Sequence, residues 1–320
     1  MSLSRDSFIQ FFSLASTHSF ANSDGVFFCS YVLHGDIRYG LSSKGYLLVL
    51  FPKRYYLNSF SIGDSFRYGP PSEYHSEQDA VVYSGVPFLY LTRNLDNQFA
   101  LLSVFCNLVS TGDPLRRLQD FFVLLQSASL HRQEFSAVGL FGELVVIDLL
   151  LKMEPSFLDD WQPSGQSVVD IIPSSWHPAI EIKSTSSSDS RIHILSLHQV
   201  RYFCENSGSL LASVQVHELQ GGTSCKDVVE NLLAHLSPDS NGYLYLTQLL
   251  VSFLGSEQFN DTSFDVALTQ STIKFYNPDF SLLLQSPIPP WLISARFSID
   301  FSHFAEAATA QLLSRPENLL

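Results

Sequence analysis

Three charged residues, Asp170, Glu181 and Lys183, lie in the stretch VVDIIPSSWHPAIEIKST at residues 168–185. The residues on either side of PSSWHP are β-branched and alternate as strands do, whereas PSSWHP carries the prolines and serines of a turn. Folding the stretch about the midpoint of that turn places Asp170 opposite Glu181, with Lys183 further along the same face. Directly opposed like charges destabilise a strand pair. The pattern therefore predicts a compensating charge beside the two acids.

A fourth charged residue, Glu143, lies in the segment SAVGLFGELVVIDLLLK at residues 136–152. This segment is apolar nearly all round, so we expect a buried helix. A glutamate within such a helix is costly unless it is paired or bound to a metal. Gly139, one turn earlier on the same side, would let another backbone or a ligand come close. Asp148 points elsewhere and is expected to be structural or partly exposed.

The three carboxylates of Glu143, Asp170 and Glu181 are expected to converge with Lys183. Oxygen-only ligands suit a hard divalent cation, Mg²⁺ or Mn²⁺, which would relieve the repulsion between the acids. Such a metal can polarise a phosphodiester and lower the pKa of a bound water. Lys183 is about 7 Å along the strand from Glu181 and would orient that water or stabilise charge on the phosphate. The residues thus predict a metal site for phosphodiester cleavage.

The first and last thirds of the chain are expected to surround these residues. Residues 1–112 predict an antiparallel β module after a short helix around Arg5–Thr17, with strands GVFFCSYV, YLLVLF, AVVYSG, PFLYLT and FALLSVF. Residues 221–320 predict an α+β extension packed on the core. Its expected helices are KDVVENLLAHL and YLYLTQLLVSFL, its expected strands are SFDVALT, STIKFYN and WLISARFSIDF, and its last dozen residues are expected to form a mobile tail.

The middle third, residues 113–220, predicts the α/β core that positions the site. One helix is expected to begin at Pro114 and a second to run from about Glu134 to Lys152. The strand pair follows, and then a third neighbouring strand near RIHILS. The helix SLHQVRYFCEN, with Ser196 as its N-cap, and the strand GSLLASVQVHEL complete the core.

Asp170, ten intervening residues and then Glu181-Ile182-Lys183 resemble the PD-(D/E)XK motif of the restriction-endonuclease-like nuclease superfamily. The expected order of elements is similar to the core of that superfamily, and Glu143 matches an acid that many members carry in a preceding helix. The chain resembles more closely a bacterial family of PD-(D/E)XK motif proteins. Its members are encoded beside methyltransferase and ATPase genes in restriction or phage-defence clusters. Val169 precedes Asp170 where the motif has proline, at a position that varies in the superfamily.

The resemblance implies a metal-dependent DNA endonuclease, the cleavage subunit of a bacterial restriction or phage-defence system. Glu143, Asp170, Glu181 and the carbonyl of Ile182 would bind Mg²⁺ or Mn²⁺, and Lys183 would serve the nucleophilic water. The implied fold class is α/β (α+β), with a restriction-endonuclease-like core. The implied partners are DNA and methyltransferase or ATPase subunits, and cutting both strands would need a homodimer. The alternative is a catalytically idle nuclease-fold subunit that binds DNA or assembles a defence complex.

Three further residues are candidates for supporting or DNA-contacting roles. Gln199 lies in the helix after the third strand, where several superfamily members carry a polar residue. His177 lies in the turn of the strand pair and would approach the substrate. Arg191 belongs to a group of basic residues in the central stretch and would contact DNA. His193 and His198 are weaker candidates, because a histidine in a core or on a surface is more common than a ligand.

The composition limits the remaining possibilities. With 320 residues, 45% hydrophobic and 15% charged, the chain can bury a large core. A net charge of −13 argues against a surface coated for non-specific nucleic-acid binding, and favours slightly the idle-subunit alternative. Four scattered cysteines without CxxC spacing, no signal pattern and no apolar run of membrane length predict a cytoplasmic protein. The sequence also lacks a P-loop, GxGxxG or GxSxG, so nothing in it indicates nucleotide hydrolysis or an esterase nucleophile.

Overall fold

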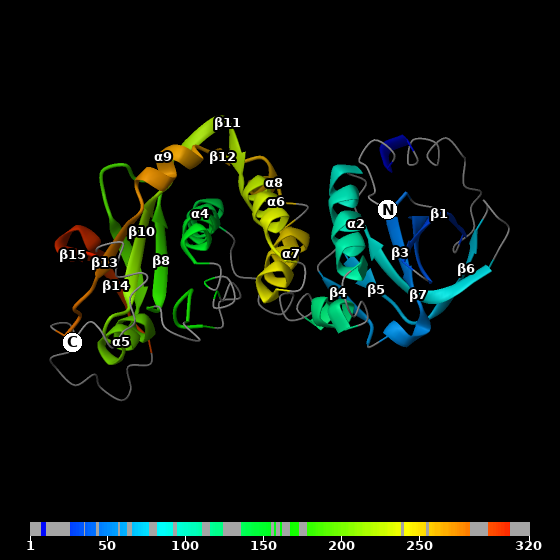
Figure 1. Cartoon of the computed structure of the whole chain (residues 1–320), viewed down its shortest axis with the longest axis horizontal. Helices are drawn as coiled ribbons and strands as arrows, with labels where there is room; N and C mark the ends of the chain where they lie inside the picture. Colours follow the sequence, from blue (N-terminus) through cyan, green and yellow to red (C-terminus); the bar gives the residue numbers. More distant parts are fainter. Residues whose placement is uncertain are drawn as a thin grey trace. The chain divides into compact units, whose positions relative to one another are not determined.

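The chain divides into two compact units in the computed structural model (Figure 1). Unit 1 comprises Met1–Arg132 and Ser237–Gly255, and unit 2 comprises Gln133–Leu236 and Ser256–Leu320. Changes of periodicity along the sequence predict boundaries after residues 112 and 220, whereas these units are defined by packing. The structure describes residues 8–10, 26–34, 36–42, 45–56, 58–62, 66–76, 82–91, 95–110, 116–123, 136–154, 157, 161, 167–172, 178–237, 240–253, 256–281 and 294–307.

Unit 1 contains a seven-stranded sheet with the order β3-β2-β1-β6-β7-β5-β4. The strands are β1 (Val26–His34), β2 (Ile37–Ser42), β3 (Leu47–Phe51), β4 (Phe60–Ile62), β5 (Phe66–Tyr68), β6 (Ser72–Ser76) and β7 (Val82–Tyr90). β3 also pairs with β7, so β3, β2, β1, β6 and β7 form a closed ring. The expected β module is therefore present. Its described pairings are antiparallel except that of β1 with β6, which is parallel.

The segment FALLSVF is helical, so its assignment as a strand is wrong. It lies within α2 (Leu95–Ser110). Leu101, Phe105 and Leu108 are buried and recur at intervals of four and three residues, which is the spacing of one helix face. Phe105 meets Phe51 of β3 edge to face, with ring centroids 5.6 Å apart. The bulky side chains suggested a strand, but the spacing of the buried positions decides for a helix.

Two further helical segments belong to unit 1. Residues 116–123 are helical, which confirms the described part of the helix expected from Pro114. The expected helix YLYLTQLLVSFL is confirmed as α7 (Asn241–Phe253). Asn107 of α2 donates a hydrogen bond of 3.0 Å to the Tyr243 hydroxyl of α7, which ties this late segment to the earlier part of unit 1. Of the first expected helix, the structure describes residues 8–10, which are helical; the rest lies outside the described residues.

Unit 2 is built on a four-stranded mixed sheet with the order β15-β13-β10-β8. The strands are β8 (Ile180–Thr185), β10 (Leu210–Gln215), β13 (Lys274–Asn277) and β15 (Ala305–Glu306). β8 and β10 run parallel, whereas β13 is antiparallel to both β10 and β15. The long helix α4 (Ala137–Met153) lies beside β8 (Figure 1). This mixed sheet with packed helices is the α/β architecture expected of a restriction-endonuclease-like core.

The remaining elements of unit 2 agree with the sequence analysis in part. The expected helices are confirmed as α5 (Leu197–Glu205) and α6 (Cys225–His235). The strand near RIHILS is β9 (Ile192–Ser196), but it pairs with β14 (Arg296–Asp300) in a separate two-stranded sheet instead of extending the sheet of β8. Most of SFDVALT is helical rather than extended, because the Asp265 side chain caps α9 (Val266–Ser271). β11 (Glu218–Ser224), β12 (Ser263–Phe264) and α8 (Glu257–Asn260) complete the unit, and the C-terminal dozen residues lie outside the described part.

The segment that carries Asp170 keeps the predicted register but is not a regular strand. Residues 167–170 form a bend, and Ile171 then makes an isolated antiparallel bridge to Ile180. Both hydrogen bonds of this bridge are present, at 2.9 and 3.0 Å. The register of 171 with 180 is the one that sets 170 opposite 181, as the sequence predicts, but the bridge itself ends at Ile171. The ladder stops there because the Val169 N–H turns to the Ser167 hydroxyl instead of to β8.

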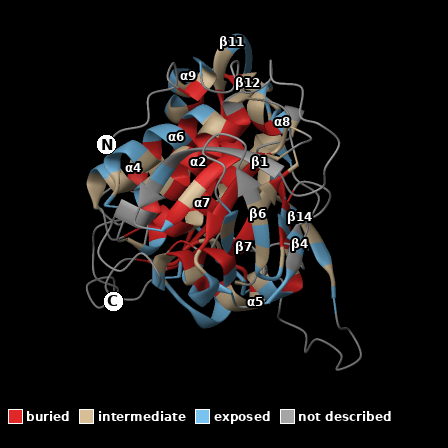
Figure 2. Cartoon of the chain, turned by 90° about the vertical axis from the view of Figure 1, so that its right-hand side faces the viewer, coloured by how far each residue is buried: buried red, intermediate tan, exposed pale blue. Residues whose placement is uncertain are grey.

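Within each unit, buried residues gather in the interior, whereas exposed residues lie along the outer sides of helices and strands (Figure 2). In unit 2, one apolar cluster joins β9, α5, β10, β13 and the bend before Ile171. It contains Val169, Ala179, Leu195, Val200, Phe203, Leu211, Tyr276, Phe280 and Phe301. Among the described residues, no helix is both long enough and apolar enough to cross a membrane.

Candidate functional site

β8 carries Glu181 and Lys183 on one face, because alternate residues of a strand point the same way. The Lys183 ammonium lies 2.5 Å from Glu181 Oε1. Glu181 is 1% exposed, and its second oxygen, Oε2, is buried without a hydrogen-bond partner among the described residues. A buried carboxylate oxygen without a donor is rare and calls for an explanation, such as an ion that the site holds.

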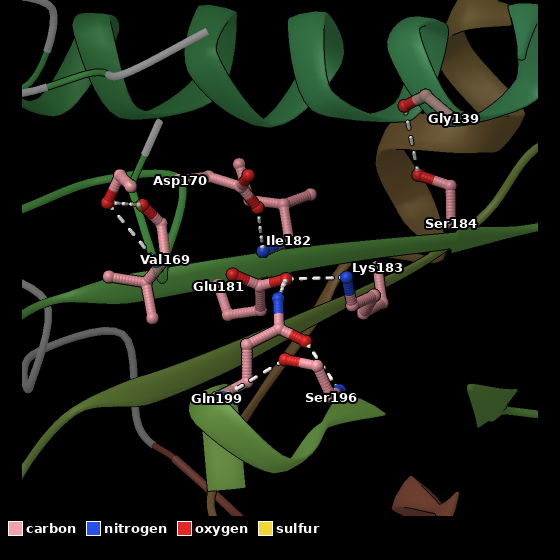
Figure 3. Close-up of polar contacts among 10 residues, drawn as sticks. Gly139, Val169, Asp170, Glu181, Ile182, Lys183, Ser184, Ser196 and Gln199 are labelled. Carbon is pink, nitrogen blue, oxygen red and sulfur yellow. Dashed lines mark hydrogen bonds and ion pairs between the residues drawn. The ribbon is translucent and has the colours of Figure 1, made fainter. Parts of the chain in front are cut away.

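Gln199 of α5 holds Glu181 from the other side (Figure 3). Its side-chain nitrogen donates to Glu181 Oε1 over 2.5 Å. Its side-chain oxygen accepts from the backbone N–H of Ser196, while the Ser196 hydroxyl accepts from the backbone N–H of Gln199. This reciprocal pair is a capping box. Because the cap takes the amide oxygen, the amide nitrogen must face Glu181.

Asp170 stands at the free edge of β8, between that strand and α4 (Figure 3). Its Oδ2 accepts a hydrogen bond of 2.6 Å from the backbone N–H of Ile182. Odd-numbered residues of β8 bond to β10, since the carbonyls of Ala179 and Thr185 accept from that side. The backbone groups of Ile182 therefore face the edge where Asp170 lies. The Ile182 carbonyl is therefore not used in the pairing with β10, and its role as a ligand stays a prediction.

Glu143 projects from the middle of α4, whose N-cap is Ser136. Glu143 Oε1 accepts a hydrogen bond of 2.6 Å from the indole N–H of Trp161. α4 approaches the face of β8 that carries Ser184, while α5 approaches the face that carries Glu181. Glu143 thus reaches the site from the opposite side of the strand, and Asp170 lies at the edge between them.

Close packing of α4 on β8 depends on Gly142. A Cβ atom at Gly142 would lie 2.1 Å from Ser184 Oγ, 2.9 Å from Ser184 Cβ and 3.2 Å from Val216 Cγ2. The sequence predicts this close approach at Gly139 instead. A Cβ atom there would meet Ser136 alone, at an ordinary 3.5 Å. The Gly139 carbonyl contacts the site only by accepting a 3.4 Å hydrogen bond from Ser184.

Burial and mutual repulsion shift the pKa values of the acids upward. Burial, and then the charge of Asp170, raises the pKa of Glu143 to about 8, although the Trp161 hydrogen bond opposes the shift. Burial raises the pKa of Asp170, against the charge of Lys183 and the Ile182 N–H. Burial and the charge of Asp170 hold the pKa of Glu181 well above its usual range. Burial lowers the pKa of Lys183, but the attractions of Glu181, Asp170 and Glu143 together outweigh it, so the net shift is upward.

These residues have the donor chemistry for a hard divalent cation. If ionised, the three acids and Lys183 carry a formal charge of −2, and Glu181 Oε2 offers an oxygen that no described group satisfies. All the side-chain ligands would be oxygens, which suits Mg²⁺ or Mn²⁺. The predicted convergence is looser than expected, however. Within the described part of the chain, no group of three or more His, Cys, Asp or Glu is arranged to hold a metal ion, because the acids approach from two faces of β8.

Two other predicted candidates have different outcomes. His177 lies outside the described residues. Arg191 donates to the carbonyls of Ser213 and Thr272 and to the side chains of Ser213 and Gln215. Its guanidinium therefore braces β10 and the end of α9, and its contact with DNA stays a prediction.

The two weaker candidates among the histidines differ in burial. His193 is buried and exchanges a hydrogen bond of 2.8 Å with Ser213, and burial lowers its pKa to about 4. His198 is exposed on α5. The described contacts of His193 are therefore those of a core histidine.

Comparison with known families gives one match. Residues 108–302, about three fifths of the chain, match the model of a family described as "Putative PD-(D/E)XK family member, (DUF4420)". The chain belongs to this family. The matched range includes all four residues of the candidate site and excludes the strands of unit 1. No curated protein and no solved structure matches the chain.

Membership in a PD-(D/E)XK family places the chain among relatives of nucleases.

Two residues that support the site, Trp161 and Gly142, could not be predicted from the sequence. Trp161 lies outside every periodic segment, and Gly142 differs from Gly139 only in which face of α4 meets β8. The neighbour of Gly142 in that contact, Ser184, directly follows Lys183 in the sequence, but its role depends on packing that no local pattern reveals.

Proposed function

We propose that this PD-(D/E)XK family member is a metal-dependent DNA endonuclease that cleaves DNA in a bacterial restriction or phage-defence system. The observation that carries the proposal is Glu181. It is buried, it is held by Lys183 and Gln199 on one oxygen, and its other oxygen has no described partner. Structural ion pairs rarely leave such an oxygen unsatisfied, whereas a cation-binding carboxylate does so until its ion arrives.

Four groups would hold the cation: the carboxylates of Glu143, Asp170 and Glu181, and the carbonyl of Ile182. Bound there, Mg²⁺ or Mn²⁺ would polarise a phosphodiester and acidify a water. Lys183 carries the positive charge of the site, and its raised pKa keeps it protonated at neutral pH. It would stabilise negative charge as it develops on the phosphate. Gln199 would fix the orientation of Glu181.

A second function is supported by a specific observation. Lys183 is ion-paired with Glu181, and the chain carries a net charge of −13. An acidic protein whose lysine is engaged in this way suits an idle nuclease-fold subunit that assembles a complex or binds DNA through partner subunits. Methyltransferase or ATPase subunits, and a second copy of the chain, are the partners that either function would use.

Cleavage of plasmid and phage DNA, methylated and unmethylated, tests the proposal. Purified chain is incubated with Mg²⁺ or Mn²⁺, beside Lys183→Ala and Asp170→Ala. The matched controls are Lys152→Ala and Asp148→Asn, which alter an exposed lysine on α4 and the aspartate it pairs with, outside the four-residue site. We expect wild type and controls to cut and both site variants to lose at least about 100-fold in rate.

Two results would decide against this function. Equal cutting by all five proteins would show that the activity lies elsewhere or is a contaminant. No cutting by wild type, even with the neighbouring-gene subunits added, would favour the idle-subunit function.

A further inference from the structure

Trp161 is the residue that connects Glu143 to the rest of the site. It is fully buried, with 0% of its surface exposed. Its backbone forms an antiparallel bridge to Ile171, and Ile171 in turn bridges Ile180 of β8. Trp161 thus occupies the next position outward from the edge of the sheet. Ile171 therefore joins Trp161 to β8, and Asp170 directly precedes Ile171 in the chain.

The indole of Trp161 reaches from this position to α4. Its N–H lies 2.6 Å from Glu143 Oε1. An indole N–H can only donate, so the bond is always directed from Trp161 to the carboxylate. One oxygen of Glu143 is therefore engaged, and the other is the one available to a further ligand. A glutamate on a helix has several rotamers, and a fixed donor selects among them.

Trp161 links the two segments that carry Glu143 and Asp170. α4 carries Glu143, and the bend carries Asp170, and these are separate segments of the chain. The bridge of Trp161 to Ile171 and the bond of Trp161 to Glu143 link the two. Outer groups that orient the ligands of a metal commonly change its affinity by about 10–100-fold when they are removed.

We propose that Trp161 is a positioning residue of the cation site, which orients the Glu143 carboxylate toward Asp170 through its indole N–H. The proposal rests on the proposed function. Trp161 touches no reacting group, and its effect acts through Glu143 alone. Removing the N–H should therefore weaken cation binding only when Glu143 is present.

Calorimetric titration of the full chain with Mn²⁺ tests this directly, without relying on catalysis. Four proteins form a cycle: wild type, Trp161→Phe, Glu143→Ala and the double variant. Trp161→Phe keeps an aromatic ring and removes the donor. We expect it to weaken Mn²⁺ binding by about 10-fold or more in wild type and by less than about 2-fold in the Glu143→Ala background. DNA cleavage by the same proteins should follow the affinities.

The matched control is Phe264→Leu. Phe264 packs on Phe141 of α4, with ring centroids 4.3 Å apart, so the change loosens the same helix without touching Glu143. Because the bond of Trp161 to Glu143 stays in place, the change should alter Mn²⁺ affinity by less than about 2-fold in both backgrounds. If Trp161→Phe fails to fold, benzothienylalanine at position 161 replaces the N–H by sulfur and keeps the shape of the indole. An analogue that replaces every tryptophan is then restricted to position 161 by the substitutions Trp176→Phe and Trp291→Phe.

The outcomes separate the two proposals. Wild type that binds no Mn²⁺ and cuts no DNA overturns the proposed function, and the positioning role with it. Wild type that binds Mn²⁺ while Trp161→Phe binds equally well overturns the positioning role alone. An equal loss with and without Glu143 also overturns it, because Trp161 would then act only through general packing.

Discussion

Gly142 and Gly139 offer a paired test of how α4 is seated on β8. Both lie in the same helix, and Gly→Ala adds one methyl group at each. In a helix this change alone stabilises by about 0.5–1 kcal/mol. At Gly139 the new methyl would meet only ordinary contacts, at 3.5 Å. We therefore expect Gly139→Ala to be neutral or to raise the free energy of unfolding by up to about 1 kcal/mol.

At Gly142 the same methyl meets β8. Ser184 Oγ, at 2.1 Å, can rotate away, but Ser184 Cβ at 2.9 Å belongs to the strand and Val216 Cγ2 at 3.2 Å blocks the alternative. Overpacking of this kind costs about 1–3 kcal/mol. After the gain in helix propensity is subtracted, Gly142→Ala should lower the free energy of unfolding by about 1–2 kcal/mol. The two variants should thus differ by roughly 2 kcal/mol, or about 4–8 °C in melting temperature for a unit of this size.

Urea denaturation followed by circular dichroism measures both variants, and DNA cleavage reports on the site. Because Glu143 directly follows Gly142, a displaced α4 should also slow cleavage by Gly142→Ala and leave Gly139→Ala unaffected. Ser184→Gly removes both clashing serine atoms, so Gly142→Ala should cost little in that background. Equal stability of the two single variants, or a cost at Gly142 that persists with Ser184→Gly, would refute the packing argument.

Three further predictions concern single residues. The pKa of His193 is about 4 when folded and about 6.5 when unfolded, so the unfolded chain binds more protons between these values. Relative to His193→Gln, wild type should lose about 3 kcal/mol of stability as pH falls from 7 to 4. Urea denaturation of both proteins at each pH measures this, and a difference in the free energy of unfolding that stays constant with pH would exclude it. Gln199→Glu keeps an acceptor for the α5 cap but sets a carboxylate against Glu181, so cleavage should fall at least 10-fold more than in Gln199→Ala when rates are compared at equal Mg²⁺. Arg191→Lys cannot reproduce the fork of hydrogen bonds and should cost about 2 kcal/mol in urea denaturation. Fluorescence anisotropy with labelled DNA should show unchanged affinity in the folded Arg191→Lys variant if Arg191 only braces the fold; weaker binding would support Arg191 as a DNA contact.

Local sequence chemistry predicted the parts of the site that depend on neighbours along the chain. The register of Asp170 with Glu181 follows from the turn between them, and the N-cap at Ser196 follows from a serine placed before a helical period. The alternation of β8 places Glu181 and Lys183 together. Each of these depends on spacing within about a dozen residues, which a single sequence displays.

The parts that failed depend on packing between distant segments. β9 finds its partner in β14, about a hundred residues later, and no local pattern specifies that choice. Gly142 and Gly139 look alike until the face of α4 that meets β8 is known. The Trp161 indole is assigned only when its bridge to Ile171 is known. In α2, large aromatic residues gave a β-like composition although their buried positions follow a helical period.

The path of the chain through the two units constrains the order in which they can form. Unit 1 begins at the N-terminus but includes α7, and unit 2 resumes at Ser256. During synthesis β8, β9, α5 and β10 therefore leave the ribosome before unit 1 is complete. Unit 1 is complete once Gly255 has been synthesised, whereas unit 2 then still lacks its last segment, Ser256–Leu320. A single cut of the gene cannot separate them either, since a fragment that ends before residue 237 lacks α7 and one that begins after residue 132 carries α7 without its partners.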